Sequence, residues 1–174
     1  KAEEEAKLSL KNANDPTPPL MQLASIEKTR GNLNAALDYV NRAVEREGGR
    51  ITKSHEGLHV LRGDVLARVG RNSEAEQEFR TEIQHFPDSA NAYSSLIVLL
   101  ASEQRVDEAT KLVFDLIKNA PTPKSYATIS ETLKAIGDDR GAMYWAYQGL
   151  QKYPKDSDLR ALARRVGVPP ARVN

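Results

Sequence analysis

Cysteine is absent from the 174 residues, so disulfides, thiolate metal sites and cysteine nucleophiles are excluded. An excess of one charge is missing as well, because 25 Lys and Arg oppose 24 Asp and Glu for a formal net charge of +1. A dedicated nucleic-acid binder carries a marked basic excess, and we therefore expect no nucleic-acid partner. Also missing is any apolar run approaching the roughly 18 residues that cross a bilayer, which predicts no membrane insertion.

What is present suits a soluble folded chain, since 40% of the residues are hydrophobic and 28% are charged. The first residues, Lys1-Ala2-Glu3-Glu4-Glu5, do not form a signal peptide, and there is no initiator Met. We therefore expect a portion of a larger protein. The composition is compatible with the cytoplasm and with the periplasm.

A repeat organises the chain. Prolines recur at intervals of 34 and 33 residues, and an alanine stands twelve residues before each of them. These positions are Pro87, Pro121 and Pro154, with Ala75, Ala109 and Ala142. An earlier alanine, Ala36, belongs to the same series. The position five residues before each of the four alanines holds, in chain order, Gly31, Gly70, Gln104 and Gly137. A fixed period of this length is the signature of a solenoid of stacked units.

Each position in the unit has a physical role. Apolar residues at helical spacing, such as Leu58, Leu61 and Val65, predict a first helix. The glycine slot ends it, because glycine accepts the left-handed conformation at a helix C-terminus. A second helix follows, whose small alanine allows two antiparallel helices to approach closely. The proline then stops the second helix, since it lacks an N–H.

This helix–turn–helix unit of about 34 residues resembles the tetratricopeptide repeat (TPR). The clearest copy keeps Gly63, Leu66, Gly70, Ala75, Phe79 and Pro87. The resemblance implies an all-α, right-handed superhelical solenoid of antiparallel helix pairs. We expect TPR-like repeats at 17–55 (with an extended linker), 56–89, 90–122 and 123–156. Residues 1–16 would supply the second helix of a truncated leading repeat, and residues 157–174 a capping helix and tail.

The motif His55-Glu56-Gly57-Leu58-His59 fits the H-E-x-x-H pattern of zinc peptidases. On one helix the two His would face one side and bind zinc, with the Glu as general base and Glu76, Glu78 or Glu82 as a third ligand. Against this, His59 occupies a position where other repeats carry Leu20, Tyr93 and Tyr126, which predicts packing between paired helices. Gly57 would also weaken the helix. We expect no metal, no cofactor and no catalytic residue.

The cluster Tyr144-Trp145-Ala146-Tyr147 contains the only Trp. Consecutive helical positions point in different directions, so the three rings cannot all be buried together. We expect two rings to pack, and we name Tyr144 and Trp145 as a possible exposed aromatic anchor, since such rings are enriched at interfaces.

In the TPR family the first helix of each repeat lines a concave groove that binds peptides or partner segments. The resemblance therefore implies a mixed-charge groove lined by Met21, Ser25, Lys28, Asp64, Arg68, Asn91, Ser94, Val98, Lys124, Glu131 and Lys134. The Lys and Asn clamp that some members use for chaperone tails is missing, because its positions hold Met21, Ser25, Leu61, Asn91 and Ser95. The preferred function is a non-catalytic interaction module of a larger bacterial-type protein, binding a protein or peptide. The alternatives are a zinc hydrolase, or a spacer that self-associates through its ends into a homo-oligomer.

Overall fold

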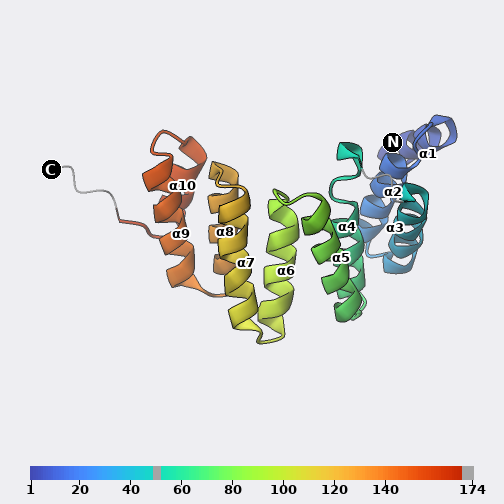
Figure 1. The fold of residues 1–174 in the computed structure, drawn as a ribbon. Helices are drawn as coiled ribbons and strands as arrows, with labels where there is room; N and C mark the ends of the chain where they lie inside the picture. The colour runs from blue at the N-terminus through green and yellow to red at the C-terminus, as the bar shows by residue number, and fades with distance from the viewer. Residues whose placement is uncertain (49–51, 170–174) are drawn as a thin grey trace. The chain divides into compact units, whose positions relative to one another are not determined.

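The structure is a computed structural model, and it describes residues 1–48 and 52–169. These ranges contain ten α-helices and one 3₁₀ helix, and no strand. The helices are α1 (Ala2–Asn12), α2 (Thr17–Arg30), α3 (Leu33–Glu47), η1 (Lys53–His55), α4 (Leu58–Arg68), α5 (Asn72–His85), α6 (Ala90–Ser102), α7 (Val106–Asn119), α8 (Pro123–Ala135), α9 (Asp139–Lys152) and α10 (Ser157–Arg165) (Figure 1). In the described ranges, none of these helices combines the length and the apolar composition that crossing a membrane requires.

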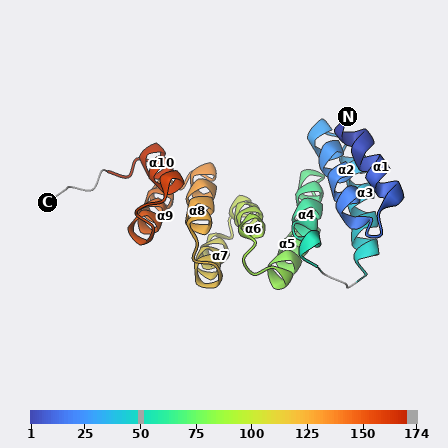
Figure 2. The same cartoon turned by 90° about the horizontal axis from the view of Figure 1, so that it is seen from above.

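The chain divides into two compact units, Lys1–Ser95 and Leu96–Asn174. In the first unit the main helix pairs are α2 with α3 and α4 with α5, and α1 packs on α2 (Figure 2). The core between α2, α3 and α4 is a cluster of buried side chains. Its members are Leu20, Ala24, Val40, Ala43, Leu58 and Leu61. Burial of apolar surface of this kind holds the helix pairs together.

In the second unit α8 pairs with α9, and α10 packs on both of them. Asp156 is the N-cap of α10, because its side chain accepts a hydrogen bond of 2.8 Å from the Leu159 N–H. Leu159, Leu162 and Val166 are buried. The last helix therefore covers the apolar side of the preceding pair, as a solenoid end requires.

The four turns between paired helices share one geometry. Gly31, Gly70 and Gly137 have φ between 80° and 87°, and Gln104 has φ 62°. The next N–H in each turn donates to a carbonyl five residues back, for example Asn32 to Glu27 at 2.9 Å. This is the Schellman arrangement, which satisfies the last carbonyls of a helix. The repeat slot that holds three glycines and one glutamine is thus a left-handed position in every copy.

Small residues bring paired helices into contact. Ala36, Ala75 and Ala142 are completely buried and Ala109 nearly so. A Cβ placed on Gly63 in α4 would lie 2.4 Å from a ring carbon of Phe79 in α5. The glycine is therefore needed there because the two helices touch directly.

The all-α fold class with antiparallel helix pairs is confirmed. The prolines also lie where the pattern placed them, just beyond the ends of α5, α7 and α9. Part of the extended linker, residues 49–51, lies outside the described residues, and so does Arg172 in the tail. The division into repeats at the boundaries given above stays our proposal.

Candidate functional site

Residues of α2 and α4 and the last residue of the first unit, Ser95, meet at one polar site around Asp64. Its Oδ2 lies 3.0 Å from Lys28 Nζ on α2, and its Oδ1 accepts a hydrogen bond of 3.2 Å from Ser95 Oγ at the edge of the unit. Asp64 itself stands on α4. The Lys28 and Asp64 side chains are both partly exposed, at 20% and 32%. The sequence singled out Lys28 and Asp64 but did not pair them.

The other expected residues of this unit differ in how far they reach solvent. Arg68, one turn beyond Asp64, is exposed, and so is Asn91, whereas Ser94 is half-buried. Ser25 is exposed and lines a hollow of about 370 Å³ between α1 and α2. Met21 differs from expectation, because its side chain packs against the core cluster and only partly faces outward.

In the second unit the expected residues lie on α6 and α8. Val98 is 41% exposed, and Lys124 is exposed. Glu131 forms an ion pair with Arg165 of α10. Lys134 forms one with Asp139, and the distance from Lys134 Nζ to Asp139 Oδ1 is 2.6 Å. A cleft of about 370 Å³ lies between α8 and α10, lined by Glu131, Lys134, Ala135, Leu162, Arg165 and Val166. It joins an apolar floor to a charged rim.

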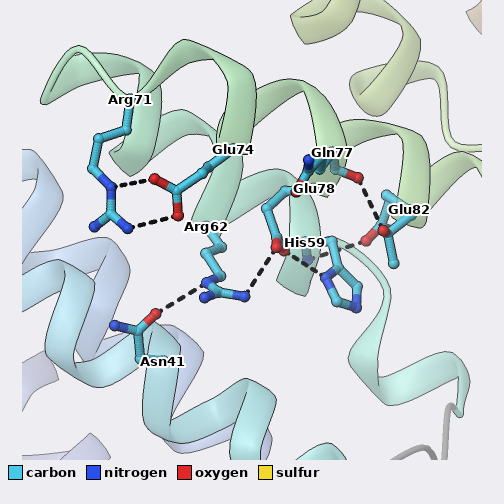
Figure 3. Close-up of polar contacts among 9 residues, drawn as sticks. Asn41, His59, Arg62, Arg71, Glu74, Gln77, Glu78 and Glu82 are labelled. Atoms are coloured by element: carbon cyan, nitrogen blue, oxygen red, sulfur yellow. Dashed lines mark hydrogen bonds and ion pairs between the residues drawn. The ribbon is translucent and has the colours of Figure 1, made fainter.

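The H-E-x-x-H motif does not lie on one helix. His55 ends η1, Gly57 is left-handed with φ 88°, and α4 starts only at Leu58. His55 Nε2 lies 3.0 Å from Asp15 Oδ2, whereas His59 Nδ1 lies 2.7 Å from Glu78 Oε2 (Figure 3). Across residues 1–48 and 52–169, no three His, Asp or Glu side chains gather as a metal ligand set. The two His are thus engaged separately, and His59 packs in the helix pair, 5.8 Å from the His85 ring.

Glu82 is a buried carboxylate that the sequence offered only as a metal ligand. It lies on α5 and accepts hydrogen bonds from two N–H groups at the start of α4, Gly57 at 2.6 Å and His59 at 3.2 Å. Burial raises the pKa of Glu82, and these two backbone hydrogen bonds oppose that shift. Its role is to satisfy the free N–H groups of a neighbouring helix.

Only one ring of the aromatic cluster is buried, not two as expected. Trp145 is 9% exposed, so it is not itself an open anchor, whereas Tyr144 is 54% exposed and Tyr147 46%. The reason is that the buried stripe of α9 (Ala142, Trp145, Ala146, Gly149) has one place for a ring. Phe114 of α7, which was not among the predicted site residues, is 58% exposed. Its position in the sequence, outside the apolar stripe of α7, could have indicated this exposure.

Comparison with known proteins gives matches in structure but none in sequence, since no family model and no curated protein matches the chain. TTC0263, a TPR protein of Thermus thermophilus, superposes with a TM-score of 0.67 over 94% of this chain and 88% of its own, at 18% identity. The chain has a tetratricopeptide-repeat fold. Two further TPR-fold neighbours are MamA and YrrB. MamA has a TM-score of 0.60 at 18% identity, covering 90% of this chain and 89% of its own. YrrB, described as a TPR protein with an unusual peptide-binding site, has a TM-score of 0.53 at 14% identity, covering 94% and 81%.

The TPR fold accounts for which helices carry the residues described above. In each unit, helix pairing separates the faces of first helices from the faces of second helices. In the first unit, Lys28, Asp64 and Arg68 lie on first helices, and in the second unit, Phe114 and Tyr144 lie on second helices. Solenoids of this kind use their extended surfaces to bind other proteins.

Proposed function

We propose that this chain is a non-catalytic protein-interaction module that binds a peptide or partner segment along the faces of its first helices. The observation that carries the proposal is that Lys28 of α2 and Ser95, the last residue of the first unit, both contact Asp64 of α4. The TPR fold supports it, because stacked repeats present such faces to partners. The peptide-binding site of YrrB, a neighbour in fold, is consistent with it.

The face around Asp64 favours an extended segment. The Lys28–Asp64 pair is internally neutral, so it offers hydrogen-bonding groups without a net charge. Arg68 lies one turn further along α4, is exposed, and has no ion pair in the described part of the chain. A ligand that hydrogen-bonds at Asp64 and places a carboxylate near Arg68 fits this arrangement.

In the second unit the cleft between α8 and α10 supports the same function. Leu162 and Val166 form an apolar floor, and Glu131 and Arg165 stand at the rim. Apolar surface with a few charged groups at its edge is the usual make-up of a site that anchors one side chain of a peptide.

The test is a selection of random peptides displayed on phage against the whole chain, followed by titration of the selected peptide. We expect Arg68→Glu to weaken binding of the selected peptide roughly tenfold, because reversal of a charge at an interface lowers the affinity. A tenfold loss of affinity corresponds to about 1.4 kcal/mol of binding free energy. Arg46→Glu, an exposed charge reversal on the second helix α3 of the same unit, is the matched control and should leave binding unchanged.

Two results would contradict the proposal. Equal weakening by both variants would remove the first-helix face from the site. Failure to select any peptide, together with self-association of the chain in light scattering, would favour the spacer function.

A further inference from the structure

We infer that the second unit carries another docking surface, separate from the first-helix faces, whose occupant is an acidic segment with apolar side chains. The aromatic face, as we call it, consists of Phe114 on α7 and of Tyr144 and Tyr147 on α9, with the buried Trp145 in contact with Phe114 and Tyr144. It is independent of the proposed function, because all four residues belong to second helices.

The aromatic face is exposed to an unusual degree for its residue types. Phe114, Tyr144 and Tyr147 are 58%, 54% and 46% exposed. A buried aromatic side chain covers about 150–250 Å², so the exposed portions of three such rings amount to roughly 300 Å². Patches of that size on a monomer are frequently functional.

Three of the rings, those of Phe114, Trp145 and Tyr144, are in direct contact. The Trp145 ring lies 5.5 Å from that of Phe114 and 5.3 Å from that of Tyr144, and both contacts are edge-to-face. Edge-to-face contacts at these distances are the favourable arrangement for aromatic pairs. The buried Trp145 thus holds an exposed ring from each of two helices at a fixed distance.

Helix packing does not require these rings. The buried residues of α7 are Ala109, Leu112, Val113 and Leu116, and Phe114 lies on the opposite side of the helix from Leu112 and Leu116. Tyr144 and Tyr147 share a face of α9 next to its buried stripe. The rings therefore present apolar area to solvent from positions outside the buried stripes of both helices.

Cations surround the aromatic face. Lys111 and Lys118 stand three residues before and four after Phe114, and Arg140 stands four before Tyr144, which places each beside a ring. Lys152 ends the same helix, and its Nζ lies 5.9 Å from the centre of the Tyr153 ring. In the described part of the chain none of these four is ion-paired, whereas Arg30, Arg71, Arg80 and Arg105 each have a carboxylate partner. Of the acids on α7 and α9, Glu108 is ion-paired with Arg105 and Asp139 with Lys134, Asp115 is half-buried, and Asp107 is exposed near the start of α7.

This combination favours an acidic partner over a second copy. A two-fold symmetric contact would bring the same face against itself and oppose its four cations, which costs free energy. The area is also small, since a stable protein interface buries about 800 Å² on each partner. An acidic segment with apolar anchors satisfies both the rings and the cations that have no ion pair.

Trp145 makes the test direct, because it is the only Trp and contacts two exposed rings. Two synthetic amphipathic peptides without Trp serve as probes, identical in their Leu and Phe positions, one with Glu and one with Lys at every polar position. Titration of the whole chain should give a saturable change of Trp145 emission with the Glu peptide and none with the Lys peptide.

The variants report on the surface without threatening the fold. Tyr144→Ala should weaken binding of the Glu peptide at least tenfold, as expected of an interface anchor. Lys111→Glu should weaken it and reduce its dependence on salt. Leu8→Ala, which shortens an apolar side chain that is 62% exposed in the first unit, is the matched control and should have no effect. Arg68→Glu should have none either, which separates this surface from the proposed function.

Three outcomes would overturn the inference. The first is equal binding of the Glu and Lys peptides, or none of the Glu peptide. The second is a dimer of the free chain that Tyr144→Ala converts to monomer, which would make a second copy the occupant. The third is a saturable Trp145 response to a single-stranded oligothymidine in place of the Glu peptide, which would assign the rings to base stacking.

Discussion

Gly63 is the position where adding one methyl group tests the helix packing most directly. A Cβ on Gly63 would lie 2.4, 2.7 and 2.9 Å from three ring carbons of Phe79. Ordinary contacts of a Cβ begin at about 3.4 Å. Phe79 is only 2% exposed, so its ring has no free space into which to move. Either α4 and α5 must separate or the ring must leave its rotamer.

Two effects of opposite sign set the magnitude for Gly63→Ala. Alanine is the better helix former by about 1 kcal/mol, whereas overpacking of a core costs about 1–3 kcal/mol. We expect the clash to exceed the propensity gain and the variant to lose about 1–2 kcal/mol of unfolding free energy.

A second background separates the two effects. Phe79→Val removes the three ring carbons at issue, and by itself it should cost about 2–4 kcal/mol as a large-to-small core change. In that background Gly63→Ala should stabilise the chain by up to about 1 kcal/mol, because only the propensity gain is left. The sign of the effect thus reverses, and the interaction energy between the two sites is about 2–3 kcal/mol.

The assay is urea denaturation of the four proteins followed by far-UV circular dichroism, with the slope compared along with the midpoint. If Gly63→Ala is as stable as the parent chain, or if it changes stability equally in both backgrounds, the direct contact between Gly63 and Phe79 is wrong.

Two further predictions concern a turn and a terminal ion pair. Gln104→Gly should raise the unfolding free energy by about 0.5–1 kcal/mol, because a side chain at φ 62° is strained. Gly137→Gln at the equivalent turn should lower the unfolding free energy by a similar amount. Equal stability of the parent chain and both variants in urea would contradict this prediction. Hydrogen bonds from Lys7 and then Arg30 lower the pKa of Glu3 to about 2, so its ion pairs persist above the unfolded pKa of 4.5 and are lost as the pH falls through about 2. An NMR titration of the Glu3 carboxyl should show this midpoint and its rise in Arg30→Gln, whereas a midpoint near 4.5 in the parent chain would refute the pairing.

The fold was predictable because the repeat encodes it locally. A left-handed slot, a small residue and a proline recur with one period, and each acts on residues close to it in the chain. Even Gln104, which breaks the glycine pattern, adopts the same turn, with the same hydrogen bond from the Arg105 N–H to the Leu100 carbonyl. Such consistency from unit to unit makes the helix pairs readable without knowledge of any contact between them.

The sites were less predictable because they depend on contacts between distant residues. Asp64 meets Ser95 across 31 positions, and Glu82 meets Gly57 across 25. Neither pairing has a local signal. The H-E-x-x-H motif failed for the opposite reason, since its spacing was right but Gly57 places the two His on different elements.

The aromatic cluster shows a third kind of limit. The spacing of apolar residues in the sequence predicts which face of a helix is buried. It does not predict how many large rings that face can hold, and the buried face of α9 holds only one of the three adjacent rings. Phe114 and Trp145 come together from helices about 30 residues apart, and a repeat pattern alone does not tell which of its exposed positions face each other.

The Glu82 carboxylate also has a consequence for how the chain is made. The residue that completes the first turn of α4 is synthesised 25 positions after Gly57. At 5–20 residues per second the ribosome needs roughly one to five seconds to reach it. During that interval the Gly57 and His59 N–H groups can bond only to water. The first turn of α4 is therefore completed only when α5, which carries Glu82, has been synthesised. The two helices are therefore finished together during translation, and a pause between them would leave α4 incomplete.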